Sequence, residues 1–226
     1  VDQRIADNFL LFRESDPVEL RSGDPVSLSD SEYGLAPNNG WQVGSSYTVQ
    51  VSPAVTGPLG VSQPISWHFQ TAVPKVLSRT PDDGANSVHI DDNQLEVVFD
   101  NKIDKAALLG GVRLLREGIE IDSSVPSSEE SADSVIVSFA PLEGLQPGTS
   151  YQAIISAAVG GPRAPGDFSW RFSTAVPRME SVFPDSGAVD VSLADLDVAA
   201  VTFSVPIHVD QRIADNFLLF RESDPV

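Results

Sequence analysis

Carboxylates are the most abundant chemically active groups in this sequence. Asp and Glu total 32 against 14 Lys and Arg, and several clustered oxygen donors are what calcium binds. Asp82 and Asp83 follow one Val-Pro junction, and Asp185 and Asp190 follow the next. These four residues are candidate Ca²⁺ ligands. The alternative is ordinary turn chemistry, because Pro-Asp-Asp-Gly is typical of a turn and the chain has no EF-hand loop.

Tryptophans are the second residue type that could bind a ligand. Trp41 follows Asn39 in an Asn-Asn-Gly-Trp loop that has no evident counterpart elsewhere in the chain. Its amphipathic ring could contact a glycan or a protein from such a loop. Trp67 and Trp170 occupy equivalent places in two related segments, and we expect both to pack in or near a core.

Catalysis finds little support among the residues. His68, His89 and His208 are far apart in sequence, and no nucleophile elbow, metalloprotease helix or phosphate-binding loop is present. Cysteine is absent, which excludes disulfides and thiolate metal sites. We predict that the chain is not an enzyme.

Charge and hydropathy exclude two classes of partner. The net charge of −18 repels phosphate backbones, so nucleic acid is not an expected partner. No apolar run approaches the roughly 20 residues of a membrane-spanning helix.

The sequence repeats itself at two levels. Residues Val1–Val18 return letter for letter as Val209–Val226, so the larger period is 209 minus 1, or 208 residues. A weaker period lies inside it, because Ser66–Pro74 (SWHFQTAVP) resembles Ser169–Pro177 (SWRFSTAVP). Two related domains therefore alternate along the repeat.

The Val-Pro junctions divide the chain into one complete domain and two partial ones. Residues 75–177 are a complete domain, which we call domain A. Residues 1–74 are the C-terminal part of domain B, and residues 178–226 begin the next copy of domain B. We expect residues 1–74 to lack their first two strands, which the preceding copy supplies within one long chain or from a neighbouring subunit.

Domain A has the pattern of an all-β sandwich. Seven strands separated by turn residues are predicted, the immunoglobulin-like number, over residues 75–79, 94–100, 112–116, 119–123, 134–139, 150–156 and 168–174, with one helical turn over residues 103–109. Apolar residues alternate within these strands, as in Val135, Val137 and Phe139, so that one face is buried. The predicted fold is a tandem of such sandwiches.

Two residue pairs are predicted to be structural. Tyr47 and Tyr151 each follow a Gly-containing turn, the setting of a tyrosine corner whose hydroxyl bonds to upstream backbone. Pro74 and Pro177 close the two junctions, which contain no Gly/Ser tether, so neighbouring domains should be nearly collinear.

Four segments of domain A resemble the bacterial immunoglobulin-like domains of S-layer proteins and giant surface adhesins. They are PDDGA from residue 81, LEVVFDNKID from 95, LQPGTSYQAIISAAVGG from 145 and FSWRFST from 168. Domain B departs from them, with Val43-Gly44-Ser45 in place of Pro147-Gly148-Thr149 and an expected longer insert over residues 29–40. The resemblance implies a load-bearing or spacing module outside the cell, without catalysis.

These observations together predict a structural repeat unit of a long extracellular fibre or cell-surface adhesin. The expected partners are copies of the same repeat, head to tail or side by side, with force carried between the first and last strands of each sandwich. Two alternatives stay open at this point: a glycan- or protein-binding module, and an accessory region of a secreted hydrolase.

Overall fold

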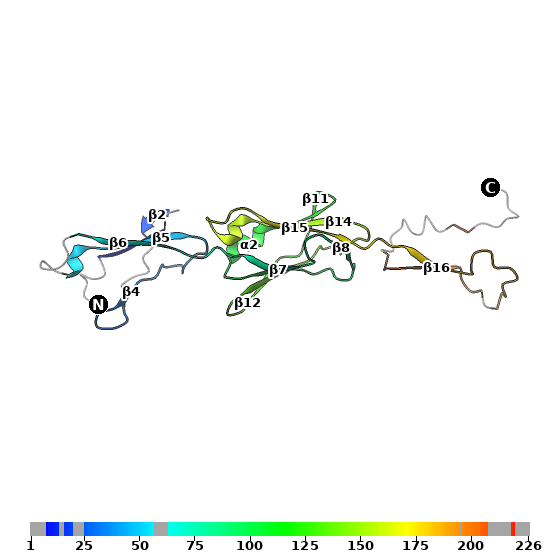
Figure 1. Ribbon diagram of the computed structural model, residues 1–226, viewed down its shortest axis with the longest axis horizontal. Helices are drawn as coiled ribbons and strands as arrows, with labels where there is room; N and C mark the ends of the chain where they lie inside the picture. The colour runs from blue at the N-terminus through cyan, green and yellow to red at the C-terminus, as the bar shows by residue number, and fades with distance from the viewer. Residues whose placement is uncertain are drawn as a thin grey trace.

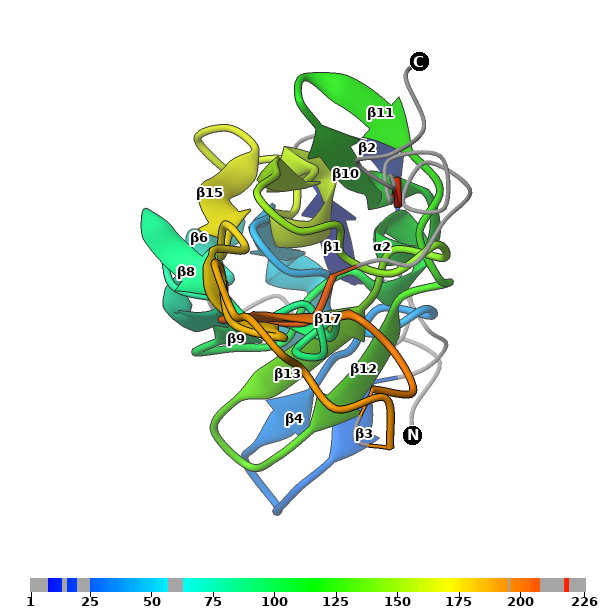
Figure 2. The same ribbon diagram turned by 90° about the vertical axis from the view of Figure 1, so that its right-hand side faces the viewer.

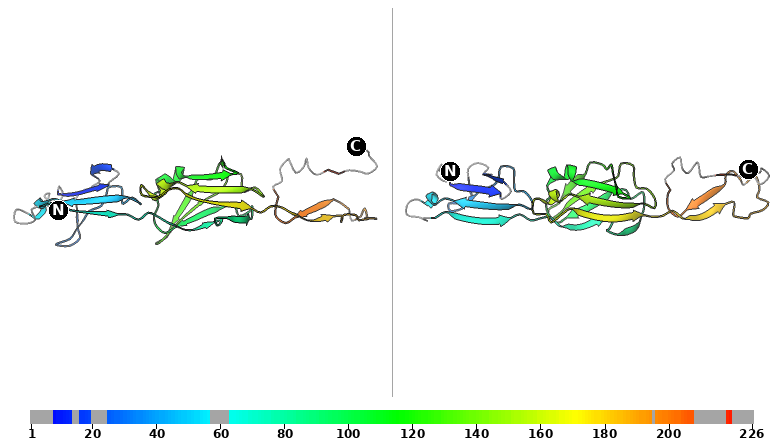
Figure 3. Two further views of the ribbon diagram at one scale, coloured as in Figure 1. Left: turned by 45° about the horizontal axis from the view of Figure 1, so that its top comes forward. Right: turned by 90° about the horizontal axis from the view of Figure 1, so that it is seen from above.

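Two facing β-sheets form the middle of the molecule, and smaller sheets lie on either side along its long axis (Figure 1). This computed structural model describes residues 8–13, 16–19, 25–56, 63–194, 196–207 and 218–219. Domain A is described throughout. Two further views show the three units following one another in a line (Figure 3).

Domain A contains nine strands and a short helix. They are β7 (Val76–Thr80), β8 (Ala85–Val88), β9 (Leu95–Phe99), α2 (Lys105–Gly111), β10 (Val112–Arg116), β11 (Ile119–Ile121), β12 (Ser127–Glu130), β13 (Val135–Phe139), β14 (Ser150–Ile155) and β15 (Phe168–Thr174), with a 3-10 turn, η2 (Ala157–Gly160), before β15. One sheet has the order β11-β10-β14-β15-β8 and the other β12-β13-β9-β7. Seen along the molecule, they form two layers (Figure 2).

The core of domain A lies between these two sheets. The alternating residues of β9, β13 and β14 are buried, as the period of two predicts. Aromatic rings bridge the layers edge-on: Phe99 lies 5.2 Å from Phe168, and Phe139 lies 6.1 Å from Trp170, between ring centroids. The prediction of an all-β, immunoglobulin-like sandwich is confirmed.

The strands β8 and β12 were not predicted, and the helix was placed two residues early. Both strands are short and largely exposed, and each pairs with a single neighbour at a sheet edge, where no apolar alternation is required. The helix begins after Asp104 because that side chain accepts hydrogen bonds from the backbone N–H groups of Ala106 and Ala107.

The predicted pairing of the first and last strands of the sandwich is wrong. The last strand, β15, pairs in parallel with the second strand, β8, whereas the first strand, β7, pairs with β9 in the opposite sheet. The chain crosses between the sheets after β7, so the two ends of the domain are held in different layers.

The N-terminal unit has most of one sheet and little of the other. Its strands β1 (Phe9–Arg13), β2 (Asp16–Glu19), β5 (Ser46–Val51) and β6 (Ile65–Gln70) have the order β2-β1-β5-β6, which corresponds to β11-β10-β14-β15 of domain A. A two-stranded ribbon, β3 (Val26–Ser27) with β4 (Tyr33–Gly34), forms a separate sheet whose Tyr33 ring lies 6.5 Å from that of Phe9 in β1. A 3-10 turn, η1 (Pro53–Thr56), follows β5. Its small core consists of Leu11, Tyr47 and Val49.

The C-terminal unit is a single antiparallel ribbon within its described residues. Strand β16 (Met179–Phe183) pairs with β17 (Ala200–Phe203). In sequence and pairing these strands correspond to β7 and β9 of domain A. Met179 and Phe183 are exposed, because no second sheet covers the ribbon among the described residues.

Within the ranges given above, no helix is long and apolar enough to cross a membrane.

Removing a core side chain from β10 tests the packing of domain A. Leu114 is fully buried, so Leu114→Ala should lower the free energy of unfolding by about 2–5 kcal/mol, as for other buried leucines. Hydrogen exchange of the β14 amides measures this loss. The control is Leu109→Ala on the exposed face of α2, which should leave exchange nearly unchanged, and equal effects of the two substitutions would contradict this core.

Candidate functional site

The turn between Gln146 and Thr149 is fixed by two side chains of domain A. The Tyr151 hydroxyl accepts a hydrogen bond of 2.8 Å from the backbone N–H of Gln146. The Thr174 hydroxyl donates to the Gln146 carbonyl at 2.5 Å and accepts from the Thr149 N–H at 2.9 Å. Both side chains are buried, so this end of the sandwich has one defined conformation.

The N-terminal unit contains the same arrangement. The Tyr47 hydroxyl accepts a hydrogen bond of 2.9 Å from the Gln42 N–H, and the Thr71 hydroxyl bonds to both the Gln42 carbonyl and the Ser45 N–H. Tyr47 stacks on Phe69 at 5.5 Å, just as Tyr151 stacks on Phe172 at 5.3 Å. The tyrosine, threonine and turn therefore form one motif that is present twice.

The differences between the two loops are smaller than the sequence indicates. Gly44 and Gly148 both have positive φ, 56° and 60°, and each donates its N–H to the carbonyl of an equivalent alanine, Ala72 or Ala175. The replacement of Pro147-Gly148-Thr149 by Val43-Gly44-Ser45 thus leaves the turn unchanged.

Trp41 does have a counterpart in domain A. The turn before it closes with a hydrogen bond from the Gly40 N–H to the Pro37 carbonyl, and Gly144 bonds to Pro141 in the same way. Trp41 therefore corresponds to the buried Leu145. Arg13 and its equivalent Arg116 are 103 residues apart, whereas Pro37 and its equivalent Pro141 are 104 apart. Domain A therefore has one residue more in this segment, and the expected longer insert over residues 29–40 of domain B is wrong.

Trp41 contacts its own unit as well as solvent. Its ring meets Tyr47 and Phe69 edge-on at 4.9 and 5.3 Å. With Asn39 it also lines a groove of about 300 Å³ whose other wall includes Lys102 and Lys105 of domain A. The two predicted contact residues thus lie at the boundary between two domains.

The backbones of the two domains meet beside this groove. The Arg163 N–H donates to the Gly44 carbonyl at 3.0 Å, and its guanidinium Nη1 donates to the Thr71 carbonyl at 3.1 Å. A Cβ atom on Gly44 would overlap the Gly160 carbonyl, and one on Gly161 would overlap the Val43 carbonyl. We call this set of contacts the B–A joint, and sequence reasoning did not find it.

The junction itself is anchored to the domain that follows it. The Lys75 N–H donates to the Asp100 carboxylate at 2.7 Å, and the Asp100 N–H donates to the Lys75 carbonyl at 3.0 Å. At the next junction Arg178 and Ser204 exchange the equivalent two bonds, at 3.0 and 2.8 Å. Pro74 is buried at the first junction and Pro177 is half-buried at the second.

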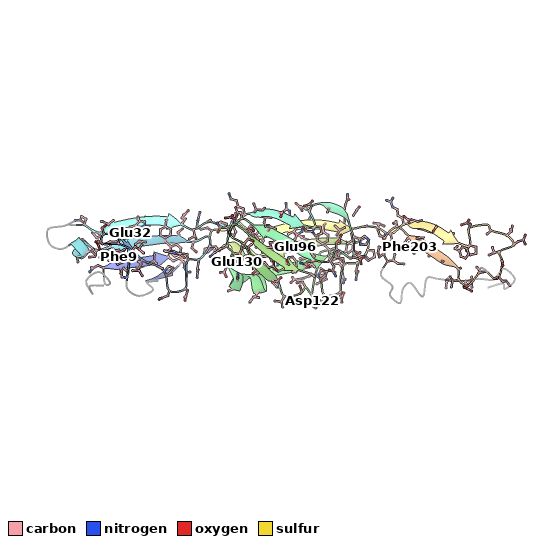
Figure 4. All side chains as sticks on the ribbon, turned by 90° about the horizontal axis from the view of Figure 1, so that it is seen from below. Phe9, Glu32, Glu96, Asp122, Glu130 and Phe203 are labelled. Atoms are coloured by element: carbon pink, nitrogen blue, oxygen red, sulfur yellow. The ribbon has the colours of Figure 1, made fainter. Side chains whose placement is uncertain are left out.

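One ion pair lies beside the joint. Lys105 Nζ is 2.8 Å from a carboxylate oxygen of Glu130, and Figure 4 labels Glu130 at the end of domain A nearest the N-terminal unit. The hydrogen bond from Lys105, followed by its positive charge, lowers the pKa of Glu130. This exposed pair contributes little to stability.

The four candidate calcium ligands do not converge. Asp83 already accepts a hydrogen bond of 3.0 Å from the Arg171 N–H and lies 3.7 Å from Arg79. Asp82 and Asp185 begin equivalent turns through their carbonyls, and Asp190 has a positive φ of 56°. No group of three or more acidic or histidine side chains that could hold a metal is found in the described part of the chain.

The described histidines do not form a common site, and the two equivalent tryptophans differ in exposure. His68 hydrogen-bonds to Thr48, and His89 pairs with Asp91, while His208 lies outside the described residues. Trp170 is 2% exposed but Trp67 is 46% exposed. The same position is thus buried in the complete sandwich and open in the N-terminal unit.

The fold and the duplicated turn define domain A as an immunoglobulin-like β-sandwich. Residues 70–174 match the family model described as "Bacterial Ig-like domain". Domain A is therefore a bacterial Ig-like domain, as the sequence resemblance indicated. No curated protein matches the chain.

The solved structures that match parts of this chain share little of its sequence. The N-terminal part of the bacterial S-layer protein SbsC is 20% identical with a TM-score of 0.32, over 49% of this chain and 25% of that one. The LD transpeptidase LdtMt1 in complex with imipenem is 18% identical with a TM-score of 0.29, over 47% and 42%. Rst D1-D2 is 14% identical with a TM-score of 0.33, over 75% and 85%. The chain thus spans a quarter of the S-layer fragment.

Removing the Tyr151 hydroxyl tests the turn. Tyr151→Phe leaves the Gln146 N–H without its acceptor and should destabilise domain A by about 1–3 kcal/mol. Burial raises the pKa of Tyr151 above its ordinary value, so the folded state holds this proton more tightly than the unfolded state. Its contribution is fully present below pH 10 and is lost as the pH rises through the raised pKa.

The measurement is urea unfolding of the wild type and the variant at neutral and alkaline pH. We expect the variant to be less stable at neutral pH and to lose less stability above pH 10. A variant as stable as the wild type at neutral pH would show that the hydroxyl does not hold the turn.

Proposed function

We propose that this chain is one period of a structural array, a fibre or surface adhesin outside the cell, in which the domains act as semi-rigid spacers. The bacterial Ig-like family of domain A supports a structural role rather than an enzymatic one. The exact return of the first 18 residues at an offset of 208 supports an array of nearly identical copies. The in-line arrangement of three units supports an extended rod (Figure 1).

The main observation in support of the array is that the same residue of the duplicated segment is buried in the first copy and exposed in the second. In the first copy of the duplicated segment, Leu11 belongs to β1, pairs with Val49 of β5 and is 0% exposed. In the second copy the identical residue, Leu219, is in no strand and is 94% exposed. The two copies differ in that only the first is followed in this chain by β5, so Leu11 is buried where β5 is present and its equivalent is exposed where β5 is absent.

The C-terminal ribbon has the strands that the N-terminal unit lacks. In domain A the sheet containing β7 and β9 covers Trp170, and β16 and β17 are the equivalents of β7 and β9. In the N-terminal unit, the described residues supply only β3 and β4 to that layer, and Trp67 stays 46% exposed. We infer that residues 178–208 of one copy complete the sandwich of residues 1–74 that follow them in the array.

The parallel pair of β8 and β15 is suited to carry force along the rod. The Gly84 N–H donates to the Arg171 carbonyl at 2.7 Å, and the Ala175 N–H donates to the Val88 carbonyl at 3.0 Å. Tension enters domain A through β7, which β9 holds in the opposite sheet, and leaves after β15. Because β8 follows β7 and runs parallel to β15, load passed on to β8 shears these bonds together rather than opening them one at a time. The load therefore acts on the second and last strands.

Two chains of identical composition test the register of domain B. The first runs from residue 1 to 208, and the second begins with residues 178–208 and continues with residues 1–177, so that both domains are whole. We expect the second chain to melt at a clearly higher temperature because it buries Trp67 and the open face of β6. Calorimetry gives the melting temperatures, and hydrogen exchange of the β6 amides locates the change.

Domain A is the internal control because it is complete in both chains, so its β14 amides should exchange at the same rate in each. Equal melting temperatures together with equal protection of β6 would contradict the completion of domain B.

A further inference from the structure

The B–A joint involves more than the proline junction, because segments distant in sequence interlock there. Arg163 follows η2, and the Asp104 N–H donates to the Val159 carbonyl at 2.9 Å, which holds η2 to the start of α2. Arg163, held in place by this bond, donates its backbone N–H to the Gly44 carbonyl and its guanidinium Nη1 to the Thr71 carbonyl of the preceding domain. A charged donor bonded to a neutral carbonyl is a strong hydrogen bond.

Close backbone approach adds a steric requirement to these bonds. Gly44 and Gly161 lie so near the opposing carbonyls that neither can carry a Cβ atom without a shift of backbone. Gly148, in the equivalent turn of domain A, would meet only Val176 at an ordinary distance of 3.6 Å. Gly44 and Gly148 both have positive φ, and among the described residues Gly44 also lies against the backbone of a neighbouring domain.

Domain B has its own version of the Arg163 segment, with two substitutions. The turn η1 of the N-terminal unit corresponds to η2, and Val55-Thr56-Gly57-Pro58-Leu59 aligns with Val159-Gly160-Gly161-Pro162-Arg163. Residues 57–59 lie outside the described residues, so the alignment rests on sequence. The glycine and proline are kept, but Leu59 stands in place of Arg163 and cannot donate a side-chain hydrogen bond.

We propose that the repeat alternates two kinds of joint. The B–A joint is locked by the Arg163 guanidinium and the Gly44–Gly161 contact, and the joint from domain A to the next domain B is more compliant because its sequence has Leu59 in place of Arg163. This inference about the second joint rests on the proposed array. The array then bends chiefly at every second joint, once per 208 residues.

Distances between spin labels on the 226-residue chain test whether the B–A joint is locked. The chain has no cysteine, so Ser66→Cys and Ser169→Cys, on the exposed positions of β6 and β15, give one labelled pair across the B–A joint. Double electron–electron resonance should show a single narrow distribution of distances between the two labels. In Arg163→Leu we expect this distribution to become broad. The matched control is Arg171→Leu, whose side chain bonds to Gln152 within domain A, and it should leave the distance narrow.

A second pair of variants separates the steric contact from the strain of the turn. Gly44→Ala and Gly148→Ala place the same side chain at the same positive φ, so both should destabilise their turn. Only Gly44→Ala should also shift or broaden the Ser66–Ser169 distance. A narrow, unshifted distance in both Arg163→Leu and Gly44→Ala would overturn the locked joint.

The compliant joint is tested in the 226-residue chain extended by one further repeat. The spin labels are attached through Ser169→Cys in the first copy and Ser66→Cys in the second. We expect a broad distribution that Leu59→Arg in the second copy makes narrow. If domain B is complete, with Trp67 protected from a quencher, but Leu59→Arg changes nothing, the alternation is overturned. If Trp67 stays exposed, the proposed array fails, while the single-chain result still decides the Arg163 lock.

Discussion

The hydrogen bond from a turn N–H to a buried tyrosine hydroxyl is the constraint on which the joint depends. Tyr47 and Tyr151 hold the turn that precedes the penultimate strand of their domains, and Thr71 and Thr174 hold the same turn from the other side. This turn is the surface that domain B presents to domain A. A repeated core interaction therefore sets the geometry between domains as well as within them.

Much of the sandwich could be predicted because its core strands are strictly alternating. The strands Val112–Arg116 and Phe168–Thr174 have the bounds expected from the sequence. β12, with the sequence Ser-Ser-Glu-Glu, carries no such pattern, since an edge strand is held by main-chain bonds to one neighbour. The pairing of β15 with β8 rather than β7 also depends on which layer each strand enters, and no local signal determines that choice.

The candidate site was only half accessible to sequence reasoning. The tyrosines follow a glycine turn and enter an alternating strand, which is a local signal. The contact of Arg163 with Gly44 and Thr71 joins residues about a hundred positions apart, and no hydrophobic periodicity in the sequence predicts it. Alignment of the two halves of the repeat contained the available clue, because Gly161 has a counterpart in Gly57 whereas Arg163 is matched by Leu59. The same alignment relates Trp41 to Leu145, which the difference between their residue types conceals.

The charge of the molecule acts differently along the rod and across it. In the proposed array, a net charge of −18 would make neighbouring rods repel one another, an effect that salt screens within about 8 Å at physiological ionic strength. The bonds of the B–A joint are instead made to neutral carbonyls at hydrogen-bond distance, where little mobile salt can intervene. Changes in salt should therefore alter the spacing between rods far more than the alignment of domains within one. In a chain without cysteine, such neutral contacts would let the proposed array combine an acidic surface with a stiff axis.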